Sequence, residues 1–220
     1  MAPPFDVTHT DRLLTTTRSV RRRLDLDRPV PREVLLECIE LALQAPTGAN
    51  RQRWRWLVLD EPGPKAAVAD VYRGAYDRYI ARREAAGDAA GASFDRNVVS
   101  SDHLAANLHR VPALILPCFL DRPPVDGPQE LIAQFYGSIL PAAWSLMLAL
   151  RSRGLGAAWT TLHLSGESEV AERLGIPESV TQVVMLPVGY YTGDEFRAAP
   201  RRPAREVTYW NRWGAKAEES

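Results

Sequence analysis

A cluster of arginines near the N-terminus contains the first residues that could bind a charged ligand. The segment Arg18-Ser19-Val20-Arg21-Arg22-Arg23 combines guanidinium groups with one hydroxyl. Guanidinium groups bind phosphate oxygens through paired hydrogen bonds, and a serine hydroxyl adds another donor. The segment therefore predicts a phosphate site, although a solvated basic helix end is an alternative that these residues leave open. A second basic group near the C-terminus, Arg197 with Arg201 and Arg202, could converge on the same phosphate.

The segment from Pro46 to Gln52 (PTGANRQ) is a second candidate binding element. It contains a turn breaker, a hydroxyl and two primary amides between a predicted helix and a predicted strand. Primary amides both donate and accept hydrogen bonds, which suits a heterocycle with both kinds of group. The alternative is a loop that ends the preceding helix and whose Asn50 caps its neighbours.

Residue patterns of hydrolases, metal enzymes and dinucleotide-binding folds are absent from the sequence. There is no GxSxG, HExxH or CxxC motif. Gly154-Leu155-Gly156 follows a predicted helix and leads into a strand, the reverse of the Rossmann order, so we interpret it as a helix end. His163 could approach a ligand, but a packed or surface histidine is the simpler interpretation. Phosphate anchors and amides without an acid–base pair favour a bound cofactor that carries the chemistry.

The elements that must position these residues alternate irregularly between helix and strand. Such irregular alternation favours an α+β fold with a mixed central β-sheet surrounded by helices. The segment 132–153 is expected to be the longest helix, ended by Gly154. A loop or lid is expected over 85–102, where the composition is rich in alanine and glycine. The patterning predicts helices over 29–44, 65–83, 102–109, 132–153 and 167–174, and strands over 54–59, 113–120, 157–162 and 180–188.

Composition limits the partners that the protein is expected to have. The chain has 220 residues and is 45% hydrophobic and 25% charged, which is typical of one globular domain over 1–220. Its 27 basic residues balance 27 acidic ones, so no net charge attracts nucleic acid or an anionic membrane. The N-terminus does not read as a secretory signal, and the most apolar stretch, Ile139–Leu150, is too short to span a bilayer. We therefore expect a soluble, cytoplasmic protein.

Four segments, in order along the chain, resemble motifs of the nitroreductase family of FMN-dependent oxidoreductases. TRSVRRR resembles the family's R-S-x-R phosphate motif, and APTGANRQRWRWLVL resembles its A-P-S/T-x-x-N-x-Q-P-W-x-F segment. LPAAWSLMLALRSRGLGAAWTT resembles the central helix and its Gly-Leu-Gly turn, and MLPVGYYTGDEFRAAPRRPAREV the closing strand and tail. The chain departs from these motifs at Thr17, where many members have a second arginine, and at Arg53, which replaces a proline.

The resemblance implies a nitroreductase-like flavin fold built as an intertwined homodimer, with FMN at the interface and the C-terminal arm, 190–220, wrapped around the partner. It implies that NADH or NADPH is a transient co-substrate and that a small molecule accepts the electrons. No metal and no catalytic side chain are expected, because the flavin itself reacts at N5. Carried over position by position, the residues that contact FMN are Arg18, Ser19 and Arg21 at the phosphate, Pro46, Thr47, Asn50 and Gln52 near the ring, Thr160 and Thr161 near N5, and Arg201 or Arg202 at the phosphate.

Three functional hypotheses follow from the sequence. The first is an enzyme that takes hydride from NADH or NADPH and reduces a nitroaromatic, a quinone or an activated alkene. The second is a non-catalytic protein that stores or senses flavin, which the departures at Thr17 and Arg53 permit. The third is a flavin specialist of the same fold that uses oxygen as its acceptor.

Overall fold

The computed structural model describes residues 4–87, 92–194 and 196–216, and the chain forms two compact units. The larger unit comprises residues 17–194, and the other combines residues 1–16 with 195–220. The second unit contains helix α1 (Val7–Thr16), which the patterning did not predict, and the short helix α8 (Ala204–Val207). The prediction of a single domain over 1–220 stays a prediction.

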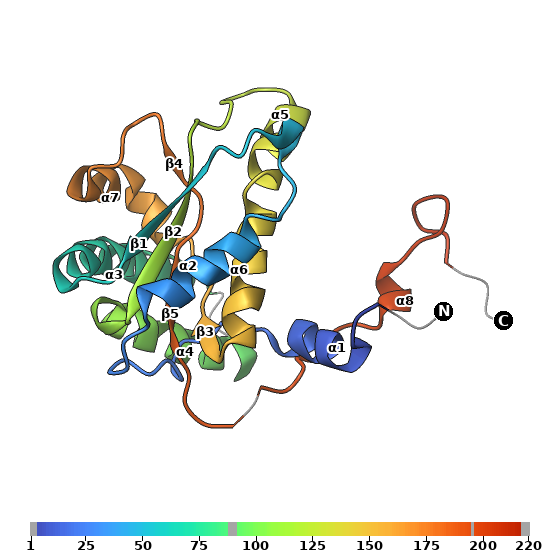
Figure 1. Ribbon diagram of the computed structural model, residues 1–220, viewed down its shortest axis with the longest axis horizontal. Helices are drawn as coiled ribbons and strands as arrows, with labels where there is room; N and C mark the ends of the chain where they lie inside the picture. Colours follow the sequence, from blue (N-terminus) through green and yellow to red (C-terminus); the bar gives the residue numbers. More distant parts are fainter. Residues whose placement is uncertain (1–3, 88–91, 195, 217–220) are drawn as a thin grey trace. The chain divides into compact units, whose positions relative to one another are not determined.

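A five-stranded sheet forms the centre of the larger unit (Figure 1). Its order is β1-β2-β5-β3, and β4 pairs with β2 off this path. The α+β class is confirmed, but the named strands all pair antiparallel, and the parallel component among the described residues is a bridge between Ser19 and Ala157. The strands are β1 (Trp54–Leu59), β2 (Ala113–Phe119), β3 (Leu155–Ala157), β4 (Thr181–Gln182) and β5 (Leu186–Tyr190).

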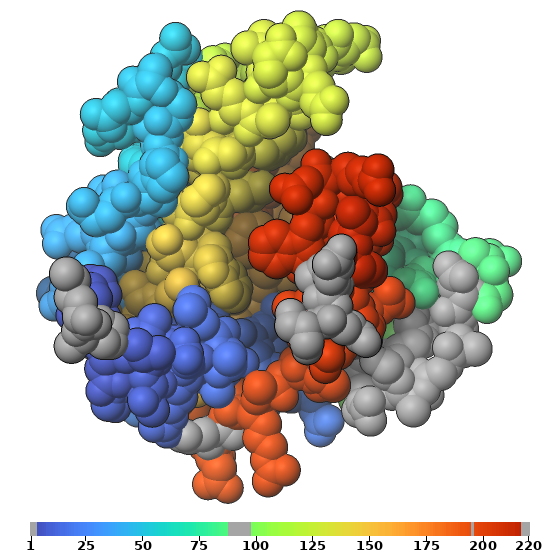
Figure 2. Space-filling view, turned by 90° about the vertical axis from the view of Figure 1, so that its right-hand side faces the viewer, coloured from blue at the N-terminus to red at the C-terminus, as the bar shows by residue number. Residues whose placement is uncertain are grey.

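Helices cover both faces of this sheet (Figure 1). On one face lie α2 (Arg32–Ala42) and α6 (Leu140–Ser152), and on the other α3 (Pro62–Ala85), α4 (Ala92–Asn107) and α7 (Glu167–Leu174). All seven residues of β2 are buried, as expected for a central strand that is packed on both faces. Figure 2 shows the surface of α6 beside that of α2, with α5 (Gln129–Gly137) at one end of α6.

Local sequence signals predicted several elements correctly. The strand over 54–59 and the helix over 167–174 have the bounds predicted from the patterning. Gly175 ends α7 with a φ of 65°, a left-handed conformation that glycine adopts at no steric cost. Gly154 likewise has a φ of 75° after α6, which confirms that it ends the helix.

The prediction of one long helix over 132–153 was wrong. The segment forms α5 and α6, with a break around residues 138–139, and α3 is longer, with 24 residues. Pro141 explains the break, since it has no N–H to donate to the carbonyl of Gly137 and its ring clashes there. By length and composition, Gln129–Ser152 is apolar enough to cross a membrane. The buried residues of α6 pack in the protein core, however, which identifies it as a core helix.

Two predicted strands also differ from those observed. The strand predicted over 157–162 is β3, which ends at Ala157, and a 3-10 helix, η3 (Leu162–Gly166), follows. The strand predicted over 180–188 is divided into β4 and β5. Their registers on β2 differ by one residue, because Cys118 pairs with Gln182 whereas Ile115 pairs with Leu186. One extra residue between the two ladders is a β-bulge, which a hydrophobic pattern does not reveal.

The region expected to form a loop or lid is largely helical where the structure describes it. α3 extends to Ala85, and α4 begins at Ala92 and continues to Asn107, so it contains most of the short helix predicted over 102–109. Residues 88–91 lie outside the described residues. A lid function for 85–102 stays a prediction.

Candidate functional site

The predicted phosphate motif lies along the edge strand β3. Ser19 forms the parallel bridge with Ala157, and the backbone N–H of Val20 donates to the Ala157 carbonyl over 2.8 Å. The N–H of Trp159 donates to Ser19 Oγ over 3.3 Å, which leaves the serine hydroxyl hydrogen available as a donor. Gly156 permits this approach, since a Cβ there would lie 2.9 Å from the Cβ of Val20. The motif is therefore bound to the sheet, in contrast to a solvated helix end.

Thr160 lies just beyond this contact, in a buried position. Its backbone exchanges two hydrogen bonds with Met185, of 3.1 and 2.9 Å, and its Oγ1 lies 3.1 Å from the hydroxyl of Tyr72 on α3. Burial raises the pKa of Tyr72, whereas the Thr160 hydrogen bond and the positive charge of Arg21 act to lower it. The bridge between Ser19 and Ala157 places the arginine segment beside the segment that contains Thr160, so the structure brings two of the predicted binding segments together. Thr161 is exposed beside them.

We expect Tyr72→Phe to lower the free energy of unfolding by about 1–2 kcal/mol. The change removes only the hydroxyl and leaves Thr160 Oγ1 without its buried partner, and an unsatisfied buried hydroxyl costs roughly this much. Urea denaturation measures the effect. Tyr136→Phe is the control, because no hydrogen bond of the Tyr136 hydroxyl is recorded among the described residues. Equal stability of the two variants would contradict the importance of the pair.

The predicted amide loop lies at the other end of α6. The N–H of Gly48 donates to Oγ of the buried Ser138, just before α6 begins, over 3.0 Å. The Gln52 side-chain amide donates to Asn50 Oδ1 over 3.0 Å, and its backbone N–H is 3.4 Å from Thr47 Oγ1. Thr47 and Gln52 line a cavity of about 250 Å³ beside this loop. The loop therefore has a defined structure, which is held by Ser138 and borders a cavity.

The two groups of predicted residues do not meet within one chain. β3 follows the C-terminal end of α6, whereas the amide loop lies at its N-terminal end (Figure 1). A 13-residue helix separates these ends by about 20 Å. Arg201 and Arg202 belong to the other unit, where both are exposed and Arg201 Nη1 donates to the Pro200 carbonyl over 3.0 Å.

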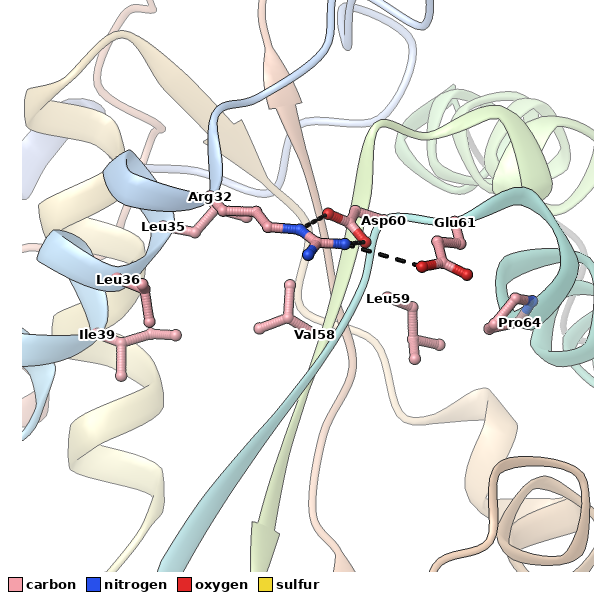
Figure 3. A pocket seen from close by; sticks show the side chains of 9 residues that line it. All are labelled: Arg32, Leu35, Leu36, Ile39, Val58, Leu59, Asp60, Glu61 and Pro64. Carbon is pink, nitrogen blue, oxygen red and sulfur yellow. Dashed lines mark hydrogen bonds and ion pairs between the residues drawn. The ribbon is translucent and has the colours of Figure 1, made fainter.

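A second cavity, of about 420 Å³, lies between α2 and β1 (Figure 3). Leu35, Ile39 and Val58 provide apolar walls, and Arg32 Nε donates to Asp60 Oδ2 over 2.5 Å. This hydrogen bond lowers the pKa of Asp60, so the two charges neutralise each other. None of the predicted site residues lines this cavity, and we do not assign it to the candidate site.

His163 is a buried histidine whose pKa is strongly shifted. It lies in η3, packed toward α3, and neither ring nitrogen has a hydrogen-bond partner in the described part of the chain. Burial lowers its pKa to about 4, while the charge of Glu167 acts in the opposite direction. It is therefore a packed neutral residue, the simpler interpretation of the sequence. In the ranges that the structure covers, no cluster of His, Cys, Asp or Glu could hold a metal ion.

The donors near β3 are suited to a phosphorylated ribityl chain. Arg18 and Arg21 bring two positive charges, and Ser19 keeps a hydroxyl donor. Thr160 and Thr161 come shortly after Ala157, the residue of β3 that pairs with Ser19. Gly156 lets this cationic segment approach the sheet closely. FMN fits this set of donors better than an uncharged ligand does, because guanidinium groups recognise phosphate.

This chain is similar to a protein-family model and to solved structures of other proteins. The family model described as the nitroreductase family matches residues 14–190. A nitroreductase-like protein from Bacillus cereus has a TM-score of 0.67 at 19% identity, covering 96% of this chain and 98% of that one. The FMN-dependent nitroreductase NfnB from Mycobacterium smegmatis, solved with NADPH, has the same TM-score and identity, covering 94% and 100%.

Iodotyrosine deiodinases are also similar to this chain. The protein from Nematostella vectensis is 24% identical over 185 residues, covering 81% of this chain and 67% of its own length. The rat protein is 27% identical over 183 residues, covering 81% and 60%. The chain thus spans about three fifths to two thirds of these relatives. With a family model over most of its length and the fold described above, the chain belongs to the nitroreductase family.

Proposed function

We propose that this protein is an FMN-dependent oxidoreductase that takes hydride from NADH or NADPH and reduces a small acceptor. The observation that carries the proposal is the attachment of Arg18–Arg21 to β3, beside the buried Thr160. Membership of the nitroreductase family supports the flavin chemistry, and the NADPH complex of NfnB supports the co-substrate. Nitroaromatics, quinones and activated alkenes are the proposed acceptors.

In this proposal the chain binds and orients, and bound FMN supplies the electron-transfer chemistry. Arg18, Ser19 and Arg21 hold the phosphate, and Arg201 or Arg202 adds a further charge there. Thr160 and Thr161 donate hydrogen bonds near N5, with the Thr160 hydroxyl oriented by Tyr72. Pro46, Thr47, Asn50 and Gln52 contact the ring of the flavin.

A second copy of the chain would complete the site. The phosphate motif and the amide loop lie about 20 Å apart, at opposite ends of α6, so one flavin is reached by both only if two subunits share it. We expect light scattering on the intact protein to give the mass of a homodimer. A stable monomer that binds FMN with full affinity would contradict the shared site.

The purified protein should be yellow, and anaerobic NADH or NADPH should bleach its visible absorbance. Adding a nitroaromatic should then restore the absorbance and consume further nicotinamide. Bound FMN that neither nicotinamide bleaches would favour the flavin-storage hypothesis. Consumption of oxygen without any other acceptor would favour the oxygen-using hypothesis.

Reductive dehalogenation is a second candidate function, favoured by the similarity to iodotyrosine deiodinases over 81% of the chain. The acceptor panel should therefore include a halogenated phenol, with release of halide as the measurement.

We propose the cytoplasm as the compartment, since Cys38 and Cys118 are both free and buried, as is usual for proteins of a reducing environment.

A further inference from the structure

The cavity beside the amide loop combines apolar walls with three arginines. Thr47 and Gln52 line it together with Arg51, Arg53 and Arg122. Its volume is about 250 Å³, large enough for part of a small molecule. We call it the Arg51 cavity.

The loop that forms one wall of this cavity holds a strained backbone. Ala49, Asn50 and Gln52 have φ angles of 50°, 52° and 48°, in the left-handed region that side chains disfavour. Such conformations persist only where the surroundings impose them, and they concentrate at binding sites. Here a Cβ on Gly48 would lie 2.6 Å from Gln134 Nε2, so the loop is packed tightly against α5. The cavity wall is therefore a constrained structure.

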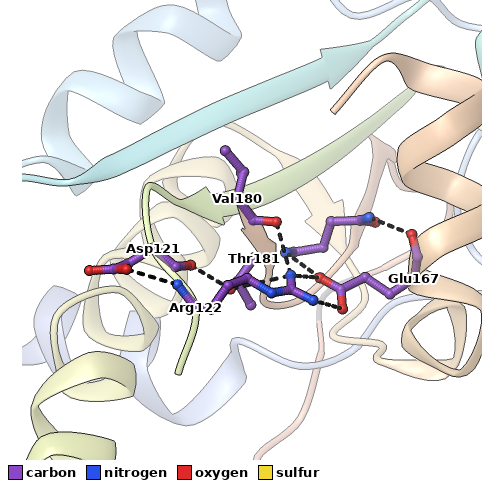
Figure 4. Close-up of polar contacts among 6 residues, drawn as sticks. Asp121, Arg122, Glu167, Val180 and Thr181 are labelled. Carbon is purple, nitrogen blue, oxygen red and sulfur yellow. Dashed lines mark hydrogen bonds and ion pairs between the residues drawn. The ribbon is translucent and has the colours of Figure 1, made fainter. Parts of the chain in front are cut away.

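Carboxylates neutralise two of the three arginines that line the cavity. Arg53 Nη1 lies 2.7 Å from Asp121 Oδ2. Arg122 makes two hydrogen bonds to Glu167, of 2.7 and 3.1 Å, and a third to the Val180 carbonyl (Figure 4). The hydrogen bonds that Arg122 donates to Glu167 raise the pKa of Arg122.

Arg51 is the third arginine, and its charge is not balanced in this way. No ion pair or side-chain hydrogen bond of Arg51 is recorded among the residues that the structure describes, and its side chain is exposed at the cavity. The Arg51 cavity therefore carries one uncompensated positive charge beside Thr47, which we place at the flavin ring. A guanidinium group with free donors is suited to a carboxylate or a phosphate.

We propose that the Arg51 cavity binds an anionic group of the substrate that exchanges electrons with the flavin, with Arg51 as the residue that selects for it. The inference rests on the proposed function, because the flavin assignment places the cavity next to the reacting ring. Two substrates could carry such a group. It is either a carboxylate on the acceptor or the additional phosphate that distinguishes NADPH from NADH.

Titration calorimetry on the purified flavoprotein tests the proposal without requiring turnover. One arm compares 4-nitrobenzoate with the uncharged 4-nitrobenzyl alcohol. The other compares NADP+ with NAD+, which differ by the same phosphate as NADPH and NADH but cannot reduce the flavin. In at least one arm, Arg51→Ala should weaken binding of the more anionic ligand by about tenfold. This is the low end of the affinity range for a charge-assisted hydrogen bond, as expected because Arg51 is exposed. Binding of the less anionic ligand should change little. The arm that responds identifies the source of the anionic group.

Two further variants serve as controls. Arg51→Lys keeps the charge and should recover part of the lost affinity, whereas Arg82→Ala removes an exposed arginine on α3, outside the cavity, and should change nothing. Equal weakening of both ligands of a pair, or no weakening in either arm, would overturn the proposal. Failure of the proposed function is recognised separately, as bound FMN that neither nicotinamide bleaches.

Discussion

Replacing Arg21 with alanine should lower the affinity for FMN by about ten- to a hundredfold. A charge-assisted hydrogen bond to an ionised group contributes roughly 1.5–3 kcal/mol, and about 1.4 kcal/mol corresponds to a factor of ten. The structure strengthens this expectation, because the bridge between Ser19 and Ala157 of β3 holds the motif in place. Fluorescence quenching of FMN on titration with apoprotein measures the dissociation constant.

Riboflavin and a neighbouring arginine provide the controls for this experiment. The loss at Arg21 should be smaller for riboflavin, which has no phosphate, and equal losses would mean that Arg21 supports the ring or the fold. Arg22→Ala is the matched variant, since Arg22 is exposed and no interaction of its side chain is recorded in the described part of the chain. Arg23 is less suitable as a control, because its Nε donates to the Thr192 carbonyl over 2.6 Å. This hydrogen bond holds the segment that follows β5.

Acidification should destabilise the protein by about 2–3 kcal/mol through His163 alone. Its pKa is about 4 in the folded protein and about 6.5 in the unfolded chain, so only the unfolded chain takes up the proton between these values. The free energy of unfolding should therefore be unaffected by this group above about pH 6.5. It should decrease as the pH falls toward 4, where the folded protein also takes up the proton. Urea denaturation near pH 7.5 and near pH 4.5 measures the difference.

Two substitutions separate His163 from the other groups that titrate in this range. His163→Leu removes the imidazole, whose two nitrogens have no recorded partner, so it should leave stability near pH 7.5 little changed and reduce the loss on acidification. His109→Gln replaces an exposed histidine and should keep the full loss. An unchanged pH dependence in His163→Leu would show that the histidine is not buried in its neutral form.

Short-range patterns in the sequence determined much of the secondary structure. Trp54–Leu59 alternates and then continues as an apolar run, and Glu167–Leu174 ends at a glycine, so each pattern is complete within a few residues. The order of the binding motifs along the chain likewise identified the family, which the match over 14–190 confirms. Such signals are local, and no distant residue is needed to interpret them.

Only the tertiary structure decided how these elements are interrupted and joined. The bulge between β4 and β5 depends on pairing with β2, some sixty residues earlier in the chain, and the same hydrophobic pattern fits an unbroken strand. The break between α5 and α6 had a local cause in Pro141. The apolar periodicity continues across that proline, however, and so predicted one helix.

The candidate site shows the same division between local and distant information. The arginine, amide and threonine segments were recognisable from residue type and spacing. Their contacts were not recognisable, because they join residues that are distant in the sequence. Tyr72 on α3 contacts Thr160, and Ser19 pairs with Ala157. The isolation of His163 and the uncompensated charge of Arg51 also follow from which groups pack nearby. Residue types determine what chemistry is available, whereas packing between distant segments decides which groups are neutralised and which remain to bind a ligand.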